Sequence, residues 1–360
     1  MLACHVDDAI VSCNNDKLLT RFQERLLECY SLSLDSGSNT YLSVQFNRTE
    51  SGAIELSQYP YTRAILEEYG FTSSKGVSTP SAHGYHPTSE QSPKTDKEKA
   101  EMTKWPYDKY KALLGSLLYL ATMTRPDIRY SAGVAARFAQ NPGKAHWTLL
   151  VRILKYLSRY PNKCIRYGDG VEGIPHCPLV GFCDATWGCD PSTRRSVSGH
   201  IVYSWSGPIE WGSKLQRCTA LSSAESELIS SNRAGKSLVW LRRIYHHDFG
   251  YKLKELSLAD KNGLTKAWFR GASPTVLFCD NTSTIHLSKN KCLPQASRHI
   301  QIRYSWIREQ VRDGLIALAY VSTSENVSDV MTKGPTPATF ARLCSRMVHS
   351  PTKKAEAKGS

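Results

Sequence analysis

The sequence contains eleven cysteines but no Cys-x-x-Cys pair, so it lacks the ligand spacing of a zinc ribbon or finger. The cysteines are odd in number and do not cluster as they do in a small disulfide scaffold. Cys4, Cys183 and Cys279 lie within apolar, strand-like runs. We therefore expect buried thiols in a reducing compartment.

Long apolar runs are also missing. No run approaches the length of about 18 residues that a membrane-spanning helix needs. No charged leader followed by an apolar core is present at the N-terminus, so the sequence shows no signal peptide. These absences predict an intracellular, soluble protein.

Acidic residues are in deficit. The chain has 32 Asp and Glu against 46 Lys and Arg, which gives a net charge of +14. Such a surplus favours polyanionic partners, above all nucleic acid, or an acidic membrane surface, although charge that only maintains solubility is the alternative. A length of 360 residues with 41% hydrophobic and 22% charged residues predicts two or three globular domains.

The first half of the chain begins with two short apolar strands on either side of Asp7 and Asp8. They predict a hairpin with two carboxylates at a tight turn, which must be either solvent-exposed or a metal site because adjacent acids repel. Residues 77–103 are rich in Ser, Thr, Pro, Lys and Glu and have no period, which predicts a linker. Residues 107–160 predict three helices, with breaks at Pro126 and Pro142.

The second half has a different pattern, which predicts a mixed α/β sheet with helices packed on it. The expected strands are Leu179–Ala185, Ser198–Trp205, Pro208–Gly212, Thr275–Cys279 and Leu315–Val321. A long helix is expected from about Ser222 to His246, with further helices from Asn281, over Ile300–Arg312 and near Asp329.

Four acidic residues lie at the ends of these elements. Asp184 and Asp280 end two apolar strands, Glu227 lies in the first turns of the long helix, and Asp329 follows the last strand. If the two strands are neighbours, all four carboxylates meet at one edge of the sheet. Carboxylates in such close contact need cations to stay ionised. Hard oxygen ligands suit Mg²⁺ or Mn²⁺, and two such ions can activate water and stabilise the leaving oxygen in phosphodiester hydrolysis.

Each acid also has an ordinary structural interpretation. Asp184 fits a turn cap, Asp280 and Asp329 fit helix N-caps, and Glu227 fits a surface helix position. Four acids in this order along this strand and helix pattern are much less expected by chance than any one of them.

The sequence resembles the C-terminal part of a copia-type retrotransposon Pol polyprotein over residues 2 to 342. His5–Val–Asp–Asp8 and Tyr41–Leu–Ser–Val–Gln45 resemble the end of a reverse transcriptase palm. The family's connecting region is matched by Leu114–Gly–Ser–Leu–Leu–Tyr–Leu120, Thr124–Arg–Pro–Asp–Ile128, His146–Trp147 and Arg152–Ile–Leu–Lys–Tyr–Leu157. Its RNase H domain is matched by Phe182–Cys–Asp–Ala–Thr–Trp187, Arg194–Arg–Ser–Val–Ser–Gly199, Ser222–Ser–Ala–Glu–Ser–Glu–Leu228, Cys279–Asp–Asn281, residues 291–307 and Asp329–Val–Met–Thr–Lys333.

This resemblance implies an RNase H-like mixed sheet with flanking helices, preceded by an α+β fragment. The implied parts are a truncated palm and thumb (1–80), a linker (81–106), a helical connecting region (107–170), an RNase H-like domain (175–342) and a disordered tail (343–360). The implied activity is that of a hydrolase: endonucleolytic, Mg²⁺- or Mn²⁺-dependent cleavage of RNA in an RNA–DNA hybrid, with two ions.

By the same resemblance, Asp184, Glu227, Asp280 and Asp329 are the catalytic and metal-binding acids. Glu225 is excluded because the family's acid is followed by an apolar pair, here Leu228 and Ile229. The basic residues near this site are expected to contact the hybrid backbone and 2′-hydroxyls, or else to be solvated surface; they are Arg194, Arg195, Lys214 and Arg217. His299 is expected to be structural, or to assist proton transfer.

Two departures from the family concern the polymerase part. His5 stands in place of the usual Tyr and Ser43 in place of the usual Gly, and the upstream fingers and first palm acid are not in this chain. Asp7 and Asp8 are therefore interpreted as a vestigial metal site that does not polymerise, and the missing upstream part is an expected partner. A catalytically dead, nucleic-acid-binding remnant is the main alternative; a transposase-like enzyme and a working polymerase are less well supported. The expected location is the cytoplasm, in a virus-like particle for an active element, or the nucleus.

Overall fold

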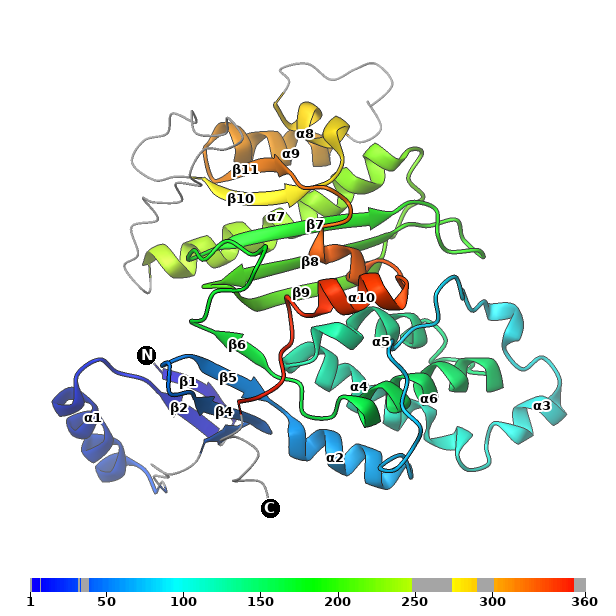
Figure 1. The fold of residues 1–360 in the computed structure, drawn as a ribbon, viewed down its shortest axis with the longest axis horizontal. Coiled ribbons are helices and arrows are strands. Elements are labelled where there is room, and N and C mark those ends of the chain that lie inside the picture. Colours follow the sequence, from blue (N-terminus) through cyan, green and yellow to red (C-terminus); the bar gives the residue numbers. More distant parts are fainter. Residues whose placement is uncertain are drawn as a thin grey trace.

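The computed structural model describes residues 2–6, 8–31, 33, 39–247, 274–289 and 301–352, with the side chains of 246–247 and 301–304 left out. Asp7, His299, the predicted connection at 252–273 and residues 353–360 lie outside the described residues. The described strands form a five-stranded, a four-stranded and a two-stranded sheet (Figure 1). Among the described helices, none is both long enough and apolar enough to cross a membrane.

The five-stranded sheet is the centre of the second half. Its strands are β7 (Val180–Thr186), β8 (Val197–Ser204), β9 (Gly207–Leu215), β10 (Thr275–Cys279) and β11 (Ile316–Tyr320). They lie in the order β11-β10-β7-β8-β9, with β8 antiparallel to its neighbours and the others parallel to β7. The strands that carry Asp184 and precede Asp280 are therefore neighbours, as their convergence requires.

Helices cover both faces of this sheet, which explains why β7 and β8 have nearly continuous buried runs. Cys183 of β7 and Leu179, which directly precedes the strand, pack in the hydrophobic cluster that contains residues of α7 (Ser223–His247), α8 (Thr282–Lys289) and α9 (Gln301–Arg312). Phe182 of β7 lies on the opposite face, with its ring 5.0 Å from that of Phe278.

The predicted helical region lies beside β9, at one edge of the sheet, and shares the hydrophobic cluster of this second face (Figure 1). Its elements are α4 (Tyr110–Met123), η3 (Pro126–Ile128), α5 (Arg129–Ala136) and α6 (Lys144–Arg159), preceded by α2 (Tyr59–Glu68) and η2 (Tyr107–Lys109). The buried guanidinium of Arg125 pairs with Asp127 at 2.8 Å, and the hydroxyl of Tyr156 also donates to Asp127 at 2.7 Å. Trp211 of β9 donates to the Ala121 carbonyl at 2.7 Å, so a polar contact joins the sheet to α4.

The N-terminal elements form the remaining sheets. The hairpin of β1 (Leu2–His5) and β2 (Asp8–Val11) is followed by α1 (Asp16–Cys29), and the other sheet has the order β3-β4-β5-β6. Its strands are β3 (Thr40–Tyr41), β4 (Val44–Arg48), β5 (Ile54–Ser57) and β6 (Ile165–Tyr167). Cys4 is exposed, contrary to the prediction, because nothing among the described residues buries the hairpin; Cys183 and Cys279 are buried, as predicted.

Two segments differ from the predicted pattern. The expected linker contains η1 (Ser89–Gln91) and α3 (Asp96–Glu101), although the domain boundaries themselves stay a prediction. The start of the predicted disordered tail is wrong, because Leu343, Met347 and Val348 are buried and His349 pairs through its backbone with Cys164. These apolar residues extend the buried face of α10 (Pro337–Cys344) into the core.

Candidate metal centre

Asp184 lies within β7, and its side chain is only 4% exposed. The hydroxyl of Thr332 donates a hydrogen bond to its carboxylate, from the end of η5 (Val327–Met331). Gly199 lies opposite Asp184 on β8, where an added Cβ would lie 2.6 Å from Cγ2 of Thr332 and 2.7 Å from Cβ of Met331. The glycine thus allows η5 to approach the strand closely enough to contact Asp184.

Glu227 reaches the same place from the first turns of α7. One carboxylate oxygen accepts a hydrogen bond from the backbone N–H of Ala185 at 3.1 Å. The other oxygen is buried and has no hydrogen-bond partner among the described residues. The hydroxyl of Ser230, nearly one turn further along α7, donates to the carbonyl of Asp184 at 2.7 Å and so fixes the helix against the strand.

Glu225 caps the start of α7, in line with its exclusion from the catalytic acids by the family resemblance. Its carboxylate accepts from the Leu221 N–H at 2.6 Å, and its own N–H donates to Ser222 Oγ at 3.1 Å. These bonds satisfy donors at the start of α7 in the manner of a capping box. The predicted surface position of Glu227 is wrong, because only 5% of that residue is exposed.

Asp280 follows β10 directly and accepts a hydrogen bond from Thr323 Oγ1 at 2.7 Å. Ligand atoms of Asp280, Glu227 and Cys279 lie within 4.8 Å of one another. The thiol of Cys279 contacts the N–H of Asn281 at 3.3 Å, and a hard cation prefers carboxylate to sulfur. Asn281, not Asp280, accepts from Thr284 N at 2.9 Å at the start of α8, so the N-cap interpretation of Asp280 is wrong.

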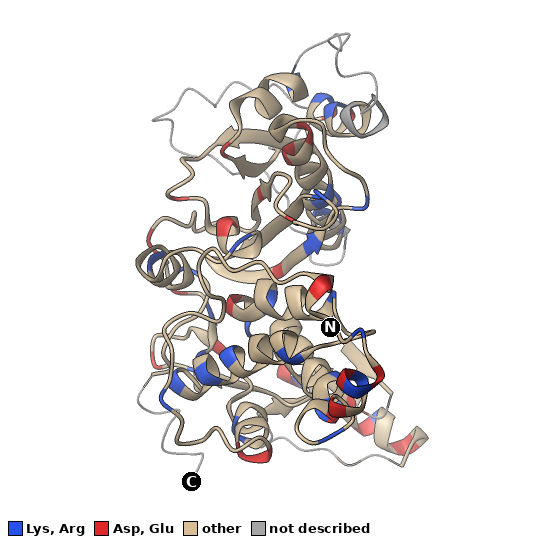
Figure 2. Cartoon of the chain, turned by 90° about the vertical axis from the view of Figure 1, so that its right-hand side faces the viewer, with Lys and Arg blue, Asp and Glu red and all other residues tan. Residues whose placement is uncertain are grey.

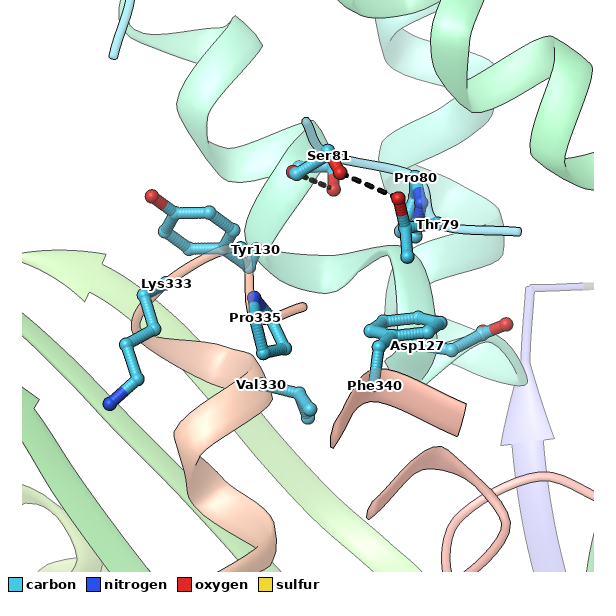
Figure 3. Close-up of a pocket in the computed structure, with 11 residues that line it drawn as sticks. Thr79, Pro80, Ser81, Asp127, Tyr130, Val330, Lys333, Pro335 and Phe340 are labelled. Atoms are coloured by element: carbon cyan, nitrogen blue, oxygen red, sulfur yellow. Dashed lines mark hydrogen bonds between the residues drawn. The ribbon is translucent and has the colours of Figure 1, made fainter. Parts of the chain in front are cut away.

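Asp329 lies in η5 and is buried. It forms an ion pair with Lys333, one turn further along the chain. Figure 3 shows the Lys333 ammonium directed away from the small pocket that Tyr130 and Pro335 help to line, toward the strands. The N-cap of η5 is Asn326, which accepts from Ser328 N at 3.2 Å, so the N-cap interpretation of Asp329 is also wrong.

These carboxyl groups interact electrostatically. Burial first, and then the charges of Asp329 and Asp280, raise the pKa of Asp184 to about 7. Burial, reinforced mainly by Asp184, raises the pKa of Glu227 to about 10. Burial also raises the pKa of Asp329, even though Lys333 opposes the rise. The ionised forms are therefore costly in this setting, and a cation among them would reverse that cost.

The residues fit a divalent metal. The donors are hard carboxylate oxygens, and one buried oxygen of Glu227 has no other partner among the described residues. The ammonium of Lys333 supplies a single positive charge to a group of four acids. The sequence analysis overlooked Lys333 and Thr332 as parts of this site, although both lie in the Asp–Val–Met–Thr–Lys motif that signalled Asp329.

The predicted nucleic-acid contacts lie on the β7–β8 turn and at the end of β9. Arg194, Lys214 and Arg217 are exposed, and Arg195 is partly buried. Lys214 pairs with Ser198, next to the Gly199 that faces Asp184, so it lies at the same end of the sheet. Figure 2 shows further Lys and Arg segments over both the sheet and the helical part, interspersed with acidic ones. Binding of nucleic acid by these four residues stays a prediction.

The predicted polymerase pair is only half described. Asp8 begins β2 and is exposed, and Asp7 lies outside the described residues. The interpretation of these two acids as a vestigial metal site therefore also stays a prediction.

Along the chain, the second strand of the sheet, β8, is antiparallel to the first, β7, and α7 lies between the third strand, β9, and the fourth, β10. This arrangement defines an RNase H-like fold. Similar solved structures include the N-terminal RNase H domain of Rv2228c from Mycobacterium tuberculosis. The sequence identity is 10%, the match covers 46% of this chain and 96% of that one, and the TM-score is 0.29. LC11-RNase H1 in complex with an RNA/DNA hybrid gives 10% identity, coverage of 43% and 93%, and a TM-score of 0.29.

Relatives are also found by sequence, and they cover nearly all of this chain. The chain is 34% identical over 349 residues to the retrovirus-related Pol polyprotein from transposon TNT 1-94 of Nicotiana tabacum, which covers 97% of this chain and 24% of the relative. It is 29% identical to the corresponding polyprotein from transposon RE1 of Arabidopsis thaliana, with 95% and 21% covered. These two relatives and the polyprotein from transposon RE2 of Arabidopsis thaliana are copia-type Pol polyproteins, and the chain spans a quarter or less of the length of each. No protein-family model matches the chain.

Proposed function

We propose that this protein hydrolyses the RNA strand of RNA–DNA hybrids in a reaction that depends on Mg²⁺ or Mn²⁺. The observation that carries the proposal is the convergence of four acids from four separate segments, with one buried oxygen of Glu227 left without a partner among the described residues. Homology to Pol polyproteins and the RNase H-like strand order support the same reaction.

Under this proposal, Asp184 serves both of two metal positions, Glu227 and Asp280 complete one, and Asp329 contributes to the other. The bound ions would activate the attacking water and stabilise the leaving oxygen. The chain's own contribution is orientation: Thr332 holds the Asp184 carboxylate and the Ala185 N–H holds that of Glu227. Ser230 keeps α7 in register with β7.

Two neighbouring glutamates allow a matched test. The purified protein, incubated with a labelled RNA–DNA hybrid and Mg²⁺ or Mn²⁺, should cut the RNA strand. Glu227→Gln and Asp184→Asn should abolish cutting, whereas Glu225→Gln should preserve it because glutamine also serves in a capping box. Intact hybrid after incubation with well-folded wild-type protein, or equal activity of the two glutamate variants, would refute the proposal.

One observation favours a second candidate, a nucleic-acid-binding remnant without catalysis. The ion pair with Lys333 already engages Asp329, one of the four acids. Under this alternative the protein binds the hybrid but leaves it intact, and calorimetry detects no binding of Mg²⁺ or Mn²⁺. Primer extension is not expected from this chain alone in either case, and extension that appears only with an added upstream segment would identify that segment as a partner.

A further inference from the structure

An exposed tryptophan adjoins the four acids. Trp187 directly follows β7, and 54% of the residue is exposed. Its indole N–H donates a hydrogen bond to the Ala220 carbonyl at 2.9 Å. This bond fixes one edge of the ring while leaving much of its apolar surface in solvent.

The hydrogen bond joins the residue that follows β7, the strand of Asp184, to the loop that precedes α7, the helix of Glu227. Trp187 lies two residues beyond Ala185, whose N–H binds Glu227, and Ala220 lies in the loop that leads into α7. Leu221, next in that loop, is 70% exposed and extends the apolar surface. The surface formed by Trp187 and Leu221, here called the Trp187 platform, therefore borders the carboxylates.

Positively charged side chains lie close to the platform along the chain. A Cβ added to Gly188 would lie 3.6 Å from a guanidinium nitrogen of Arg194, so this charge lies beside the residue that follows Trp187. Arg217 is exposed three residues before Ala220. An exposed aromatic surface with guanidinium groups nearby suits a ligand that combines flat or apolar groups with phosphates.

Local hydrogen bonds hold the platform in place. The Gly188 N–H donates to Ser196 Oγ at 3.0 Å, and the Leu221 N–H donates to the Glu225 carboxylate at 2.6 Å. The side chain of Gln216 donates to the Ser226 carbonyl at 3.0 Å, which ties the loop before α7 to the helix itself. A surface ordered before binding loses little conformational entropy when a ligand arrives.

We propose that the Trp187 platform binds the sugars and base edges in the wide, shallow minor groove of an RNA–DNA hybrid and so sets the register of the RNA strand over the four acids. The inference rests on the proposed function only in taking the hybrid as substrate. An A-form-like minor groove exposes the sugars, which offer the apolar contact that the ring can make without unstacking a base. Arg194 then faces the adjoining phosphates.

The test measures hybrid binding without divalent ions, so it does not depend on cleavage. We expect Trp187→Ala to raise the Kd for the hybrid about tenfold, equivalent to about 1.4 kcal/mol. Trp187→Phe should raise it less than about threefold, because phenylalanine keeps an apolar aromatic ring at this position. Trp240→Ala is the matched control: it removes a 59% exposed tryptophan on α7, about 20 Å along the helix from Glu227.

Fluorescence gives a second readout. Binding of the hybrid should quench tryptophan emission in the wild type and in Trp240→Phe, and much less in Trp187→Phe. Equal Kd values for the Trp187→Ala and Trp240→Ala variants, or unchanged quenching in Trp187→Phe, would overturn the inference even if the protein cuts hybrids. A wild type that binds hybrid through Trp187 but does not cut it would instead refute the proposed function and leave this inference intact.

Discussion

The chain presents two groups of acids, and their surroundings differ. Asp8 lies on the β1–β2 hairpin, where all residues of β1 are exposed and α1 has no buried residue. Asp184, Glu227 and Asp329 are buried between a five-stranded sheet and the helices packed on it. Asp8 thus lies in a setting with much less buried surface around it.

Packing accounts for this difference. A two-stranded hairpin has only its own ladder to hold it and is marginally stable in water. The end of β7, the central strand of the larger sheet, is held by the neighbouring buried strands and by the side chains of Ser230 and Asn326, which donate to its backbone. Only in the second setting can carboxylates be held close together in spite of their repulsion.

The largest expected effect separates the two groups directly. Asp184→Asn should lower cleavage of an RNA–DNA hybrid by at least about 1,000-fold, equivalent to about 4 kcal/mol, because it removes a charge shared by both proposed metal positions. Asp8→Asn should stay within about twofold of the wild type. Single-turnover rates at saturating Mg²⁺ check this, and a similar loss in both variants would remove the distinction between the groups.

Metal binding should stabilise one region only. A cation at 100 times its Kd should add about 2.7 kcal/mol to the free energy of unfolding. Scanning calorimetry with Mn²⁺ should show a higher Tm, and hydrogen exchange should slow in β7 and β10 but not in β1 and β2. No change of Tm in Mn²⁺, or equal slowing in the hairpin, would contradict this expectation.

Lys333 provides a smaller test of the same site. Lys333→Met removes the only ion-pair partner of Asp329 among the described residues. Because the buried carboxylate loses its ion pair, the free energy of unfolding of the metal-free protein should fall by about 1–2 kcal/mol. Mn²⁺ should restore most of this loss. Lys333→Arg is the control that keeps the charge, and urea midpoints with and without metal measure both effects.

The contact of the C-terminal segment with the four-stranded sheet, outside both groups of acids, should respond to pH. His349, which pairs through its backbone with Cys164 next to β6, has its pKa lowered to about 4 by burial and by the charges of Arg166 and Lys163. A lowered histidine pKa means that the unfolded chain binds the proton first, so stability is full above about pH 6.5 and declines as pH falls toward 4.

The size of this loss should be about 1–2 kcal/mol, because the residue as a whole is partly exposed. The change in urea midpoint between pH 7.5 and pH 5 should shrink in His349→Gln. The same pH dependence in both proteins would assign it to other groups, such as His146, whose pKa burial also lowers.

Much of the fold could be predicted because its signals are local. The apolar runs that became β7 and β10, and the 3.6-residue period of α4 and α6, depend on neighbours a few positions apart. The same reasoning failed for Cys4, which lies in an apolar run but is exposed. It also failed for residues 343–348, because the disordered tail was predicted to begin at 343 although Leu343, Met347 and Val348 are buried.

By itself, the sequence determined which helices and strands form and which acidic residues lie at their ends. The periodicity of apolar side chains and the sequence motifs each extend over only a few consecutive residues. Only the tertiary structure decided that Gly199 leaves room for η5 to approach β7 closely, and that Lys333 forms an ion pair with Asp329. The exposure of Trp187 was likewise decided by the tertiary structure. Contacts across 33 to 148 positions of chain, such as Trp187 to Ala220 and Thr332 to Asp184, depend on how whole elements pack. Burial and its effect on charge follow from that packing, and no local pattern encodes them.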